Sequence, residues 1–265
     1  YIGDWSSDVC SSDLRRTDCR DFVIRGGMKP RYAIYYVPDP RTHLGNFGAH
    51  WLGWDINRAI EADLHPLAGV DVDERRELVT PPAPYGFHAT LKAPFFLAPP
   101  FVETDLLRAA EKLAQTLLAP PTFKLELTQL GRFLALTPAG SQPNIDALAV
   151  RCVTELDSFR APLTAGDRER RRPETLSQKQ TEFLDRWGYP FVLDEYRFHL
   201  TLTGALSEDA CIRIAPLIAR ELDVILSTTV ALDAITVVCQ DHTDAPFRIL
   251  ERLPLRSNKE ASKAL

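Results

Sequence analysis

Two five-residue words of almost the same composition constrain this chain more than any other feature of its sequence. FHATL occupies residues 87–91 and FHLTL occupies residues 198–202. Apolar residues alternate with a histidine and a threonine in both words, and successive side chains of a β-strand point to opposite faces of a sheet. Each word therefore predicts a strand whose apolar face packs against the interior, while its other face presents an imidazole and a hydroxyl.

The segments around the two words follow each other in the same order. After each word come a helical pattern, a strand and a second strand that runs back, over 103–138 in the first case and 207–255 in the second. A helical segment also precedes each word, at 49–63 and at 144–159. This order predicts an internal duplication. We expect an α+β fold of two pseudo-symmetric lobes, each with an antiparallel sheet packed by helices, and an active groove between the lobes.

The duplication predicts one bilobal domain over residues 28–265, with sequence halves of about 28–140 and 141–256. The length of the whole chain, 265 residues, is compatible with one large domain. Residues 1–27 precede the only methionine, Met28, and the stretch DWSSDVCSSDL within them resembles the conceptual translation of a sequencing-library adapter. We therefore expect residues 1–27 to be a leader that is not native to the domain and is dispensable for its fold.

The polar residues of the two words can perform acid–base chemistry if the words face each other. His88 and His199 carry imidazoles whose ordinary pKa is about 6.5, so one can be neutral while the other is protonated. One imidazole can then take a proton from water, and the other can give a proton to a leaving oxygen. The hydroxyls of Thr90 and Thr201 can donate hydrogen bonds to an oxyanion whose charge grows in the transition state. This set suits in-line displacement at a phosphodiester and requires no metal.

Two histidines buried for packing alone are the alternative interpretation of the same words. A single HxT triplet is a weak signal, because chance can produce it in a chain with six histidines. Four identical positions in two five-residue words are a stronger signal, since each word also stands at the same place in a duplicated half. The pattern therefore favours a shared site.

Further residues near the words are secondary candidates for substrate binding. Lys92 continues the polar face of the first word and would place a cation there, unless it is only an exposed charge at a strand end. Tyr85 and Tyr196 each stand three residues before a motif histidine, where they could line the groove or pack in the core. The basic run from Arg168 to Arg172 could bind a second phosphate or form a solvated charged surface.

Composition and charge argue against several classes of function. The net charge of −5 disfavours a protein that wraps long nucleic acid, although a local basic cluster suffices for a small anionic substrate. No apolar run approaches the ~18 residues of a membrane span, so we expect no membrane partner. The sequence has no P-loop, no GxGxxG and no metal-ligand spacing such as HExxH, so we expect no cofactor and no metal. Cys152, Cys211 and Cys239 lack CxxC spacing, which favours free thiols in a reducing cytoplasm.

The pair HATL and HLTL resembles the two HxTx motifs of the 2H phosphoesterase superfamily, which includes RNA 2′,3′-cyclic phosphodiesterases. The stretches YGFHATLKAPF, LSQKQTEFLDRWGYP and EYRFHLTLTG are similar, more narrowly, to a bacterial subfamily of unknown function. Genes of that subfamily lie beside genes for carbon–phosphorus lyase, and its members are often labelled phosphonate-metabolism proteins. The resemblance runs from about Met28 to Leu255, nearly the whole chain.

This resemblance implies roles for the motif residues and a function for the groove. It makes His88 and His199 the acid and the base, and Thr90 and Thr201 the phosphate ligands. The implied function is metal-independent hydrolysis of a small cyclic phosphodiester, with a five-phosphorylated ribose 1,2-cyclic phosphate in phosphonate catabolism as one candidate substrate. Two alternatives stay open: an enzyme that opens RNA 2′,3′-cyclic phosphates, and a non-catalytic module that binds a phosphorylated ligand.

Overall fold

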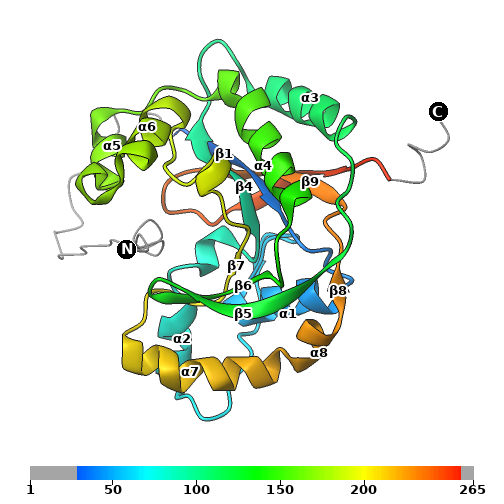
Figure 1. Cartoon of the computed structure of the whole chain (residues 1–265), viewed down its shortest axis with the longest axis vertical. Helices are drawn as coiled ribbons and strands as arrows, with labels where there is room; N and C mark the ends of the chain where they lie inside the picture. The colour runs from blue at the N-terminus through cyan, green and yellow to red at the C-terminus, as the bar shows by residue number, and fades with distance from the viewer. Residues whose placement is uncertain (1–28, 258–265) are drawn as a thin grey trace.

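The computed structural model describes residues 29–257, and this part of the chain is a mixed α+β structure with antiparallel sheets and eight α-helices (Figure 1). The expected α+β class is therefore confirmed, while the expectation about residues 1–27 lies outside the described residues. One four-stranded sheet has the order β10–β9–β1–β4, and the other has the order β7–β6–β5–β8. The strands are β1 (Arg31–Tyr36), β4 (Ala89–Phe96), β5 (Phe123–Leu130), β6 (Phe133–Pro138), β7 (Leu200–Thr201), β8 (Thr229–Val230), β9 (Ala234–Gln240) and β10 (Arg248–Pro254), with a separate pair of β2 (Trp54–Asp55) and β3 (Ile60–Glu61).

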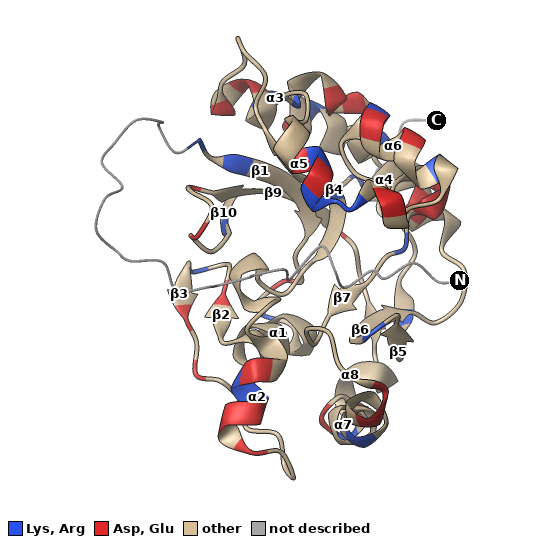
Figure 2. Cartoon of the chain, turned by 90° about the vertical axis from the view of Figure 1, so that its left-hand side faces the viewer, with Lys and Arg blue, Asp and Glu red and all other residues tan. Residues whose placement is uncertain are grey.

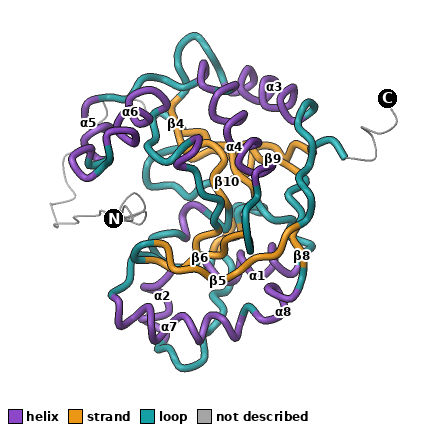
Figure 3. The backbone as a smooth tube through the Cα atoms, viewed as in Figure 1, coloured by secondary structure: helices purple, strands orange, loops and turns teal. Residues whose placement is uncertain are grey.

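Helices pack against both four-stranded sheets (Figure 3). Helices α3 and α4 contact the first sheet, and α7 and α8 contact the second. The helix expected at 49–63 lies earlier in the chain, because Gly53 takes a left-handed φ of 75° and ends it. The helices are α1 (His43–Leu52), α2 (Val72–Val79), α3 (Glu103–Ala114), α4 (Pro143–Glu155), α5 (Ala165–Arg170), α6 (Gln178–Trp187), α7 (Glu208–Glu221) and α8 (Asp223–Ser227).

Each four-stranded sheet combines strands from both halves of the sequence. In the first sheet, β1 pairs with β4 on one side and with β9 on the other, both antiparallel. In the second sheet, β6 pairs with β5 in a hairpin and with β7, which belongs to the second half. The two halves are therefore interleaved, and neither can complete a sheet without the other.

The apolar residues of both words lie in the main hydrophobic core, as their alternation predicts. This core includes Phe87, Ala89, Leu91, Phe198, Leu200 and Leu202. Trp51 of α1 is fully buried, and its indole Nε1 donates a hydrogen bond to the Leu202 carbonyl at 2.8 Å. Helix α1 thus anchors the second word, although it precedes the first word in the chain.

Gly48 on α1 permits a close approach between this helix and the first word. A Cβ at this position would clash with the ring of Phe87, the residue before His88. We expect Gly48→Ala to lower the free energy of unfolding by about 1–3 kcal/mol, because the ring must move out of a packed core. Urea denaturation would measure the change.

Gly166→Ala in α5 is the matched control, because its added Cβ would have Thr164 Oγ1 as its nearest neighbour at 4.0 Å. Alanine favours a helix over glycine by about 1 kcal/mol, so the control should be neutral or stabilising. A Gly48→Ala variant as stable as the control would contradict the packing argument.

Candidate functional site

A backbone carbonyl holds the imidazole of each motif histidine in the same way. His88 Nδ1 lies 2.8 Å from the Gly86 carbonyl oxygen, and His199 Nδ1 lies 2.8 Å from the Arg197 carbonyl oxygen. A carbonyl oxygen only accepts, so Nδ1 of each ring must carry the proton and donate it. Nε2 of each neutral ring is then left with a lone pair that can accept a proton.

The two motif threonines differ in how their hydroxyls are engaged. Thr90 Oγ1 lies 3.1 Å from His88 Nε2, and it must be the donor because the ring proton is on Nδ1. Within residues 29–257, the Thr201 hydroxyl forms no hydrogen bond with another side chain. The first hydroxyl therefore orients a base, while the second is available to a ligand.

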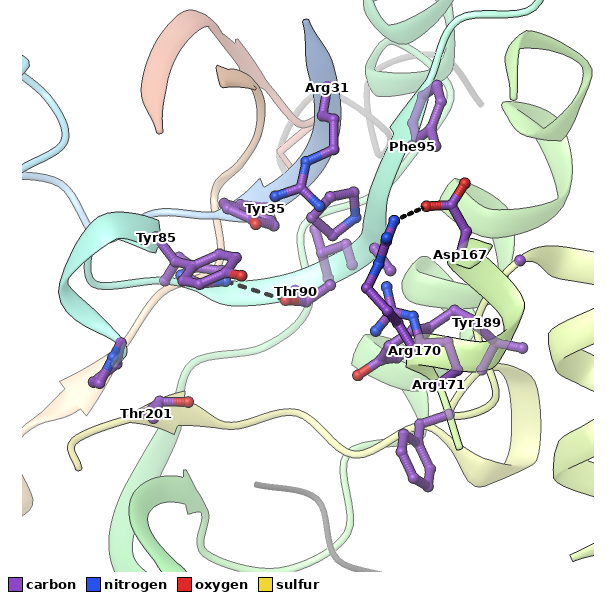
Figure 4. A pocket seen from close by; sticks show the side chains of 18 of the residues that line it. Arg31, Tyr35, Tyr85, Thr90, Phe95, Asp167, Arg170, Arg171, Tyr189 and Thr201 are labelled. Atoms are coloured by element: carbon purple, nitrogen blue, oxygen red, sulfur yellow. Dashed lines mark hydrogen bonds and ion pairs between the residues drawn. The ribbon is translucent and has the colours of Figure 1, made fainter. Parts of the chain in front are cut away.

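Both words line one pocket of about 640 Å³, although their histidines stand 111 residues apart in the sequence. The lining includes His88, Thr90, His199 and Thr201. Figure 4 shows Thr90 on β4 and Thr201 on β7 at different walls of this pocket. The interleaved sheets thus bring two imidazoles and two hydroxyls around a single space.

Burial controls the protonation of both imidazoles. Burial and, to a smaller extent, the positive charge of a protonated His199 lower the pKa of His88 to about 4, against the opposing effect of the Gly86 carbonyl. Burial also lowers the pKa of His199, and the Arg197 carbonyl opposes that change. Both rings are therefore mostly neutral at neutral pH.

An aromatic wall stands behind His88, and sequence reasoning found only part of it. Tyr35 stacks on the His88 ring with centroids 3.7 Å apart, and Tyr85 lies 6.5 Å from the same ring. Tyr85 also stacks on Phe247 at 5.4 Å. Tyr35 was not among the predicted site residues, because its role depends on the pairing of Tyr35 with Thr90 across β1 and β4.

Tyr196 also lines the pocket, but its hydroxyl is buried. Among the residues that the structure describes, this hydroxyl has no hydrogen-bond partner. Burial raises its pKa well above the ordinary value, and the nearby Cys152 and Asp146 of α4 add to the effect. Tyr85 and Tyr196 therefore both reach the pocket, in different surroundings.

Lys92 does not line the pocket, and the prediction that it continues the face of Thr90 is wrong. Ile34 pairs with Lys92 and Tyr35 pairs with Thr90, so a β-bulge leaves Leu91 without a partner in β1. The bulge turns Lys92 to the face of Ile34, which packs in the core. Only 3% of Lys92 is exposed, and its Nζ donates to the Val153 carbonyl at 3.0 Å and to Asp157 Oδ1 at 3.1 Å.

The basic run beside α5 divides between the pocket and the surface. Arg170, Arg171 and Arg172 line the pocket, whereas Arg168 pairs with Asp185 of α6 at 2.7 Å. Figure 2 shows that α5 carries acidic and basic residues side by side. In Figure 4 the Arg170 side chain forms an ion pair with Asp167 at the wall formed by α5.

Three other arginines line the pocket outside this run: Arg31, Arg160 and Arg197. Arg160 pairs with Asp157 at 2.8 Å and donates to the Arg186 carbonyl at 2.8 Å. None of the three was predicted from the sequence. Alternate residues of a strand lie on the same face, so Arg31 shares a face of β1 with Tyr35. Recognition of Tyr35 as a site residue could therefore have pointed to Arg31.

Neither a metal centre nor a membrane segment is visible in residues 29–257. This part of the chain contains no group of three or more His, Cys, Asp or Glu side chains that could hold a metal ion. Its helices are all too short or too polar to cross a membrane.

A protein family described as "Protein of unknown function (DUF1045)" matches residues 90–248. The chain belongs to this family. The matched segment of this chain starts within FHATL and contains the whole of FHLTL.

Two curated relatives carry the name "Ribose 1,5-bisphosphate phosphokinase PhnN". The protein from Janthinobacterium sp. (strain Marseille) is 35% identical over 234 residues, which is 87% of this chain and 52% of the relative. The protein from Laribacter hongkongensis (strain HLHK9) is 36% identical over 184 residues, which is 67% of this chain and 41% of the relative. The chain thus spans about half the length of these relatives or less.

Among solved structures, the chain is similar to a conserved protein of unknown function from Agrobacterium tumefaciens strain C58. The TM-score is 0.43 and the sequence identity is 13%, over 85% of this chain and 86% of that one.

The surroundings of Lys92 predict a structural role that stability measurements can separate from substrate binding. We expect Lys92→Ala to lower the free energy of unfolding by about 2–4 kcal/mol, because it opens a cavity and removes a partner of Asp157. The Michaelis constant for any substrate of the pocket should not change. Lys92→Met is the control, since it refills the volume and should recover most of the stability. A higher Michaelis constant in Lys92→Ala without any loss of stability would contradict this role.

Proposed function

We propose that this chain is a metal-independent phosphodiesterase that opens a small cyclic phosphodiester. The observation that carries the proposal is the pair of imidazoles in one pocket, each with Nδ1 bonded to a backbone carbonyl, so that Nε2 of each neutral ring carries the lone pair. This arrangement supports acid–base chemistry at two positions of one substrate. The resemblance to the 2H phosphoesterase superfamily points to the same reaction.

In the proposed reaction, His88 Nε2 takes a proton from a water molecule as the water oxygen bonds to phosphorus. The bond between phosphorus and one ring oxygen breaks, and protonated His199 gives its proton to that oxygen. Burial lowers the pKa of His88 to about 4, so this ring stays neutral over a wide pH range and is the candidate for the base. As the substrate binds, the Thr90 hydroxyl would turn from His88 Nε2 to a non-bridging oxygen, which also frees Nε2 to accept the proton of water. Thr201 would donate to another non-bridging oxygen.

The substrate itself supplies the charge that the acid needs. Both imidazoles are mostly neutral at neutral pH, since burial lowers the pKa of each. A phosphodiester carries a negative charge, and an anion beside an imidazole raises its pKa. Binding thus promotes protonation of His199 in the same complex in which the proton is used.

The name of the curated relatives suggests which molecule is opened. Hydrolysis of a five-phosphorylated ribose 1,2-cyclic phosphate at its 2-oxygen would yield ribose 1,5-bisphosphate, the compound in that name. This chain has no P-loop, and it spans about half of each relative. We infer that the kinase activity belongs to the part of the relatives that the chain does not match, so the two reactions would be consecutive steps.

The cellular setting follows from the same proposal. The chain would act in phosphonate catabolism, as the resemblance to the subfamily beside carbon–phosphorus lyase genes implies. Cys152, Cys211 and Cys239 are buried free thiols, which is consistent with a reducing cytoplasm.

An RNA 2′,3′-cyclic phosphate is the second candidate substrate, because aromatic rings line the pocket. Tyr85 lies beside His88, and Tyr189 lines the same pocket. Aromatic side chains can stack on the unpaired base at an RNA end. The net charge of −5 favours the small sugar phosphate over a long nucleic acid.

We also infer an internal duplication with exchanged strands. One unit would run β1–α1–β4–α3–β5, and the other β6–α4–β7–α7–β9. In each unit the strand of the HxT word pairs with the first strand of that unit, and the last strand pairs with the first strand of the other unit. The boundary between the units would then fall at the β5–β6 turn, before residue 140.

Substitution of the histidines tests the reaction. We expect His88→Ala and His199→Ala each to reduce kcat by roughly 10²–10⁴-fold, the usual contribution of a positioned proton donor or acceptor. The double variant should lose little more, since both groups act in one step. Phosphorus NMR of the phosphomonoester product measures the rate, and EDTA should leave it unchanged.

His43→Ala is the control for these variants, because His43 is exposed at the start of α1 and does not line the pocket. The proposal fails if chelation abolishes activity and a divalent ion restores it. It also fails if either histidine variant keeps wild-type turnover. Binding of a cyclic phosphate without turnover would instead support the non-catalytic module.

The lowered pKa values predict an acidic optimum for kcat/KM, which reports on the free enzyme. The acid must be protonated, and its pKa lies below the ordinary value of about 6.5. The profile should therefore be bell-shaped, with its maximum below about pH 6.5, and should fall toward neutral pH. The maximum of kcat should lie at higher pH, because bound phosphate raises the pKa of the acid. Initial rates measured from acidic to neutral pH test this prediction. A kcat/KM that rises through neutral pH would contradict the predicted acidic maximum.

A further inference from the structure

Arg31 is an ordered cation at the wall of the pocket. It is the first residue of β1, and its Nε donates to Gln240 Oε1 of β9 at 2.7 Å. Its guanidinium carbon lies 5.9 Å from the centroid of the Phe247 ring. Two contacts thus fix the plane of the guanidinium while its terminal nitrogens remain available.

The partner of Arg31 is itself fixed and carries no charge. Gln240 is 3% exposed, and its amide nitrogen donates to the carbonyls of Thr243 at 3.0 Å and Ala245 at 2.8 Å. Both hydrogen bonds orient the amide oxygen toward Arg31. A glutamine holds the guanidinium in place as a glutamate would, but it leaves the positive charge uncompensated.

Three other arginines, two of which line the pocket, differ from Arg31 in this respect. Arg160 pairs with Asp157, Arg248 pairs with Asp241 at 2.8 Å, and Arg170 pairs with Asp167. Within residues 29–257, no carboxylate forms an ion pair with Arg31. An arginine that served only to join strands would gain more from a carboxylate, so the neutral partner points to an external anion.

The position of Arg31 relative to the histidines suits one small substrate. Arg31 and Tyr35 lie on the same face of β1, with Cα atoms about 13 Å apart at ~3.3 Å per residue. Tyr35 stacks on His88, and the long side chain of Arg31 covers part of the interval. In Figure 4, Arg31 extends into the pocket from β1, and Arg170 extends into the pocket from α5.

We propose that Arg31 anchors a second anion subsite, which binds a phosphate monoester on the same substrate whose cyclic phosphodiester reacts between the histidines. The guanidinium presents a planar fork of donors that matches two phosphate oxygens. Arg170 on the opposite wall adds a second cation, and its pair with Asp167 loosens as the phosphate approaches. This inference rests on the proposed phosphodiesterase function and names the determinant of its substrate choice.

A matched pair of substrates tests the subsite: ribose 1,2-cyclic phosphate with and without a phosphate on its 5-oxygen. The measured quantity is the ratio of the two kcat/KM values, which should favour the phosphorylated compound in the wild type. Arg31→Met should reduce this ratio by roughly 10–100-fold, because one charge-assisted contact is lost. Arg31→Lys keeps the charge but not the planar fork of donors. Its ratio should therefore fall between the ratios of the wild type and of Arg31→Met.

Arg108→Met is the control for the loss of one positive charge, since Arg108 of α3 is exposed and outside the pocket. Its ratio should equal that of the wild type. Melting temperatures of all variants show whether a change reflects unfolding. A ratio in Arg31→Met equal to that of the wild type overturns the subsite.

Ribose 5-phosphate provides a second measurement that does not depend on catalysis. Isothermal titration calorimetry should show weaker binding to Arg31→Met than to the wild type and to Arg108→Met. Equal binding to all three proteins overturns the subsite. If neither cyclic phosphate is hydrolysed, the proposed function fails, and the calorimetry still decides the role of Arg31.

Discussion

The antiparallel pairing of β1 with β9 is the constraint on which the rest of the structure depends. It joins the first strand of the described chain to a strand more than 190 residues later, with Tyr35 opposite Thr236. On its other side, β1 pairs with β4 and places Thr90 beside Tyr35. The second sheet is built in the same interleaved manner, since β6 pairs with β5 and with β7. Such long-range pairing lets two words that are distant in sequence line one pocket.

Local geometry then sets the chemistry of each imidazole. The carbonyl two residues before each histidine accepts the Nδ1 proton, so the tautomer is decided within three consecutive residues. The protonation state is decided by the pocket, because burial lowers the pKa of both rings. These effects together place two neutral imidazoles at one pocket, and an anionic ligand there would raise the pKa of both rings. The same burial would make the proposed reaction dependent on the charge of the substrate.

Charge around the pocket is arranged by neutral and acidic partners. Asp157 compensates the charge of Arg160. It also accepts a hydrogen bond from Lys92, which is buried away from the pocket. Arg31 has Gln240 as its partner instead, so its charge remains for a ligand. A pocket with two imidazoles at one place and an uncompensated guanidinium at another fits the proposed substrate, a sugar that carries two phosphates. The curated relatives, about twice as long as the matched region, are named for an enzyme of such a sugar.

The sequence by itself determined the elements that depend on neighbours along the chain. The alternation of FHATL and FHLTL predicted both strands, their apolar faces and the four polar residues that meet in the pocket, because strand periodicity is a local property. Only the tertiary structure decided the face of Lys92, since the bulge at Leu91 is visible only in the register between β4 and β1. Tyr35 and Arg31 were missed for the same reason. Their roles come from the strands beside them, where Thr90 and Gln240 stand, and strand pairing between distant segments has no signature within either segment.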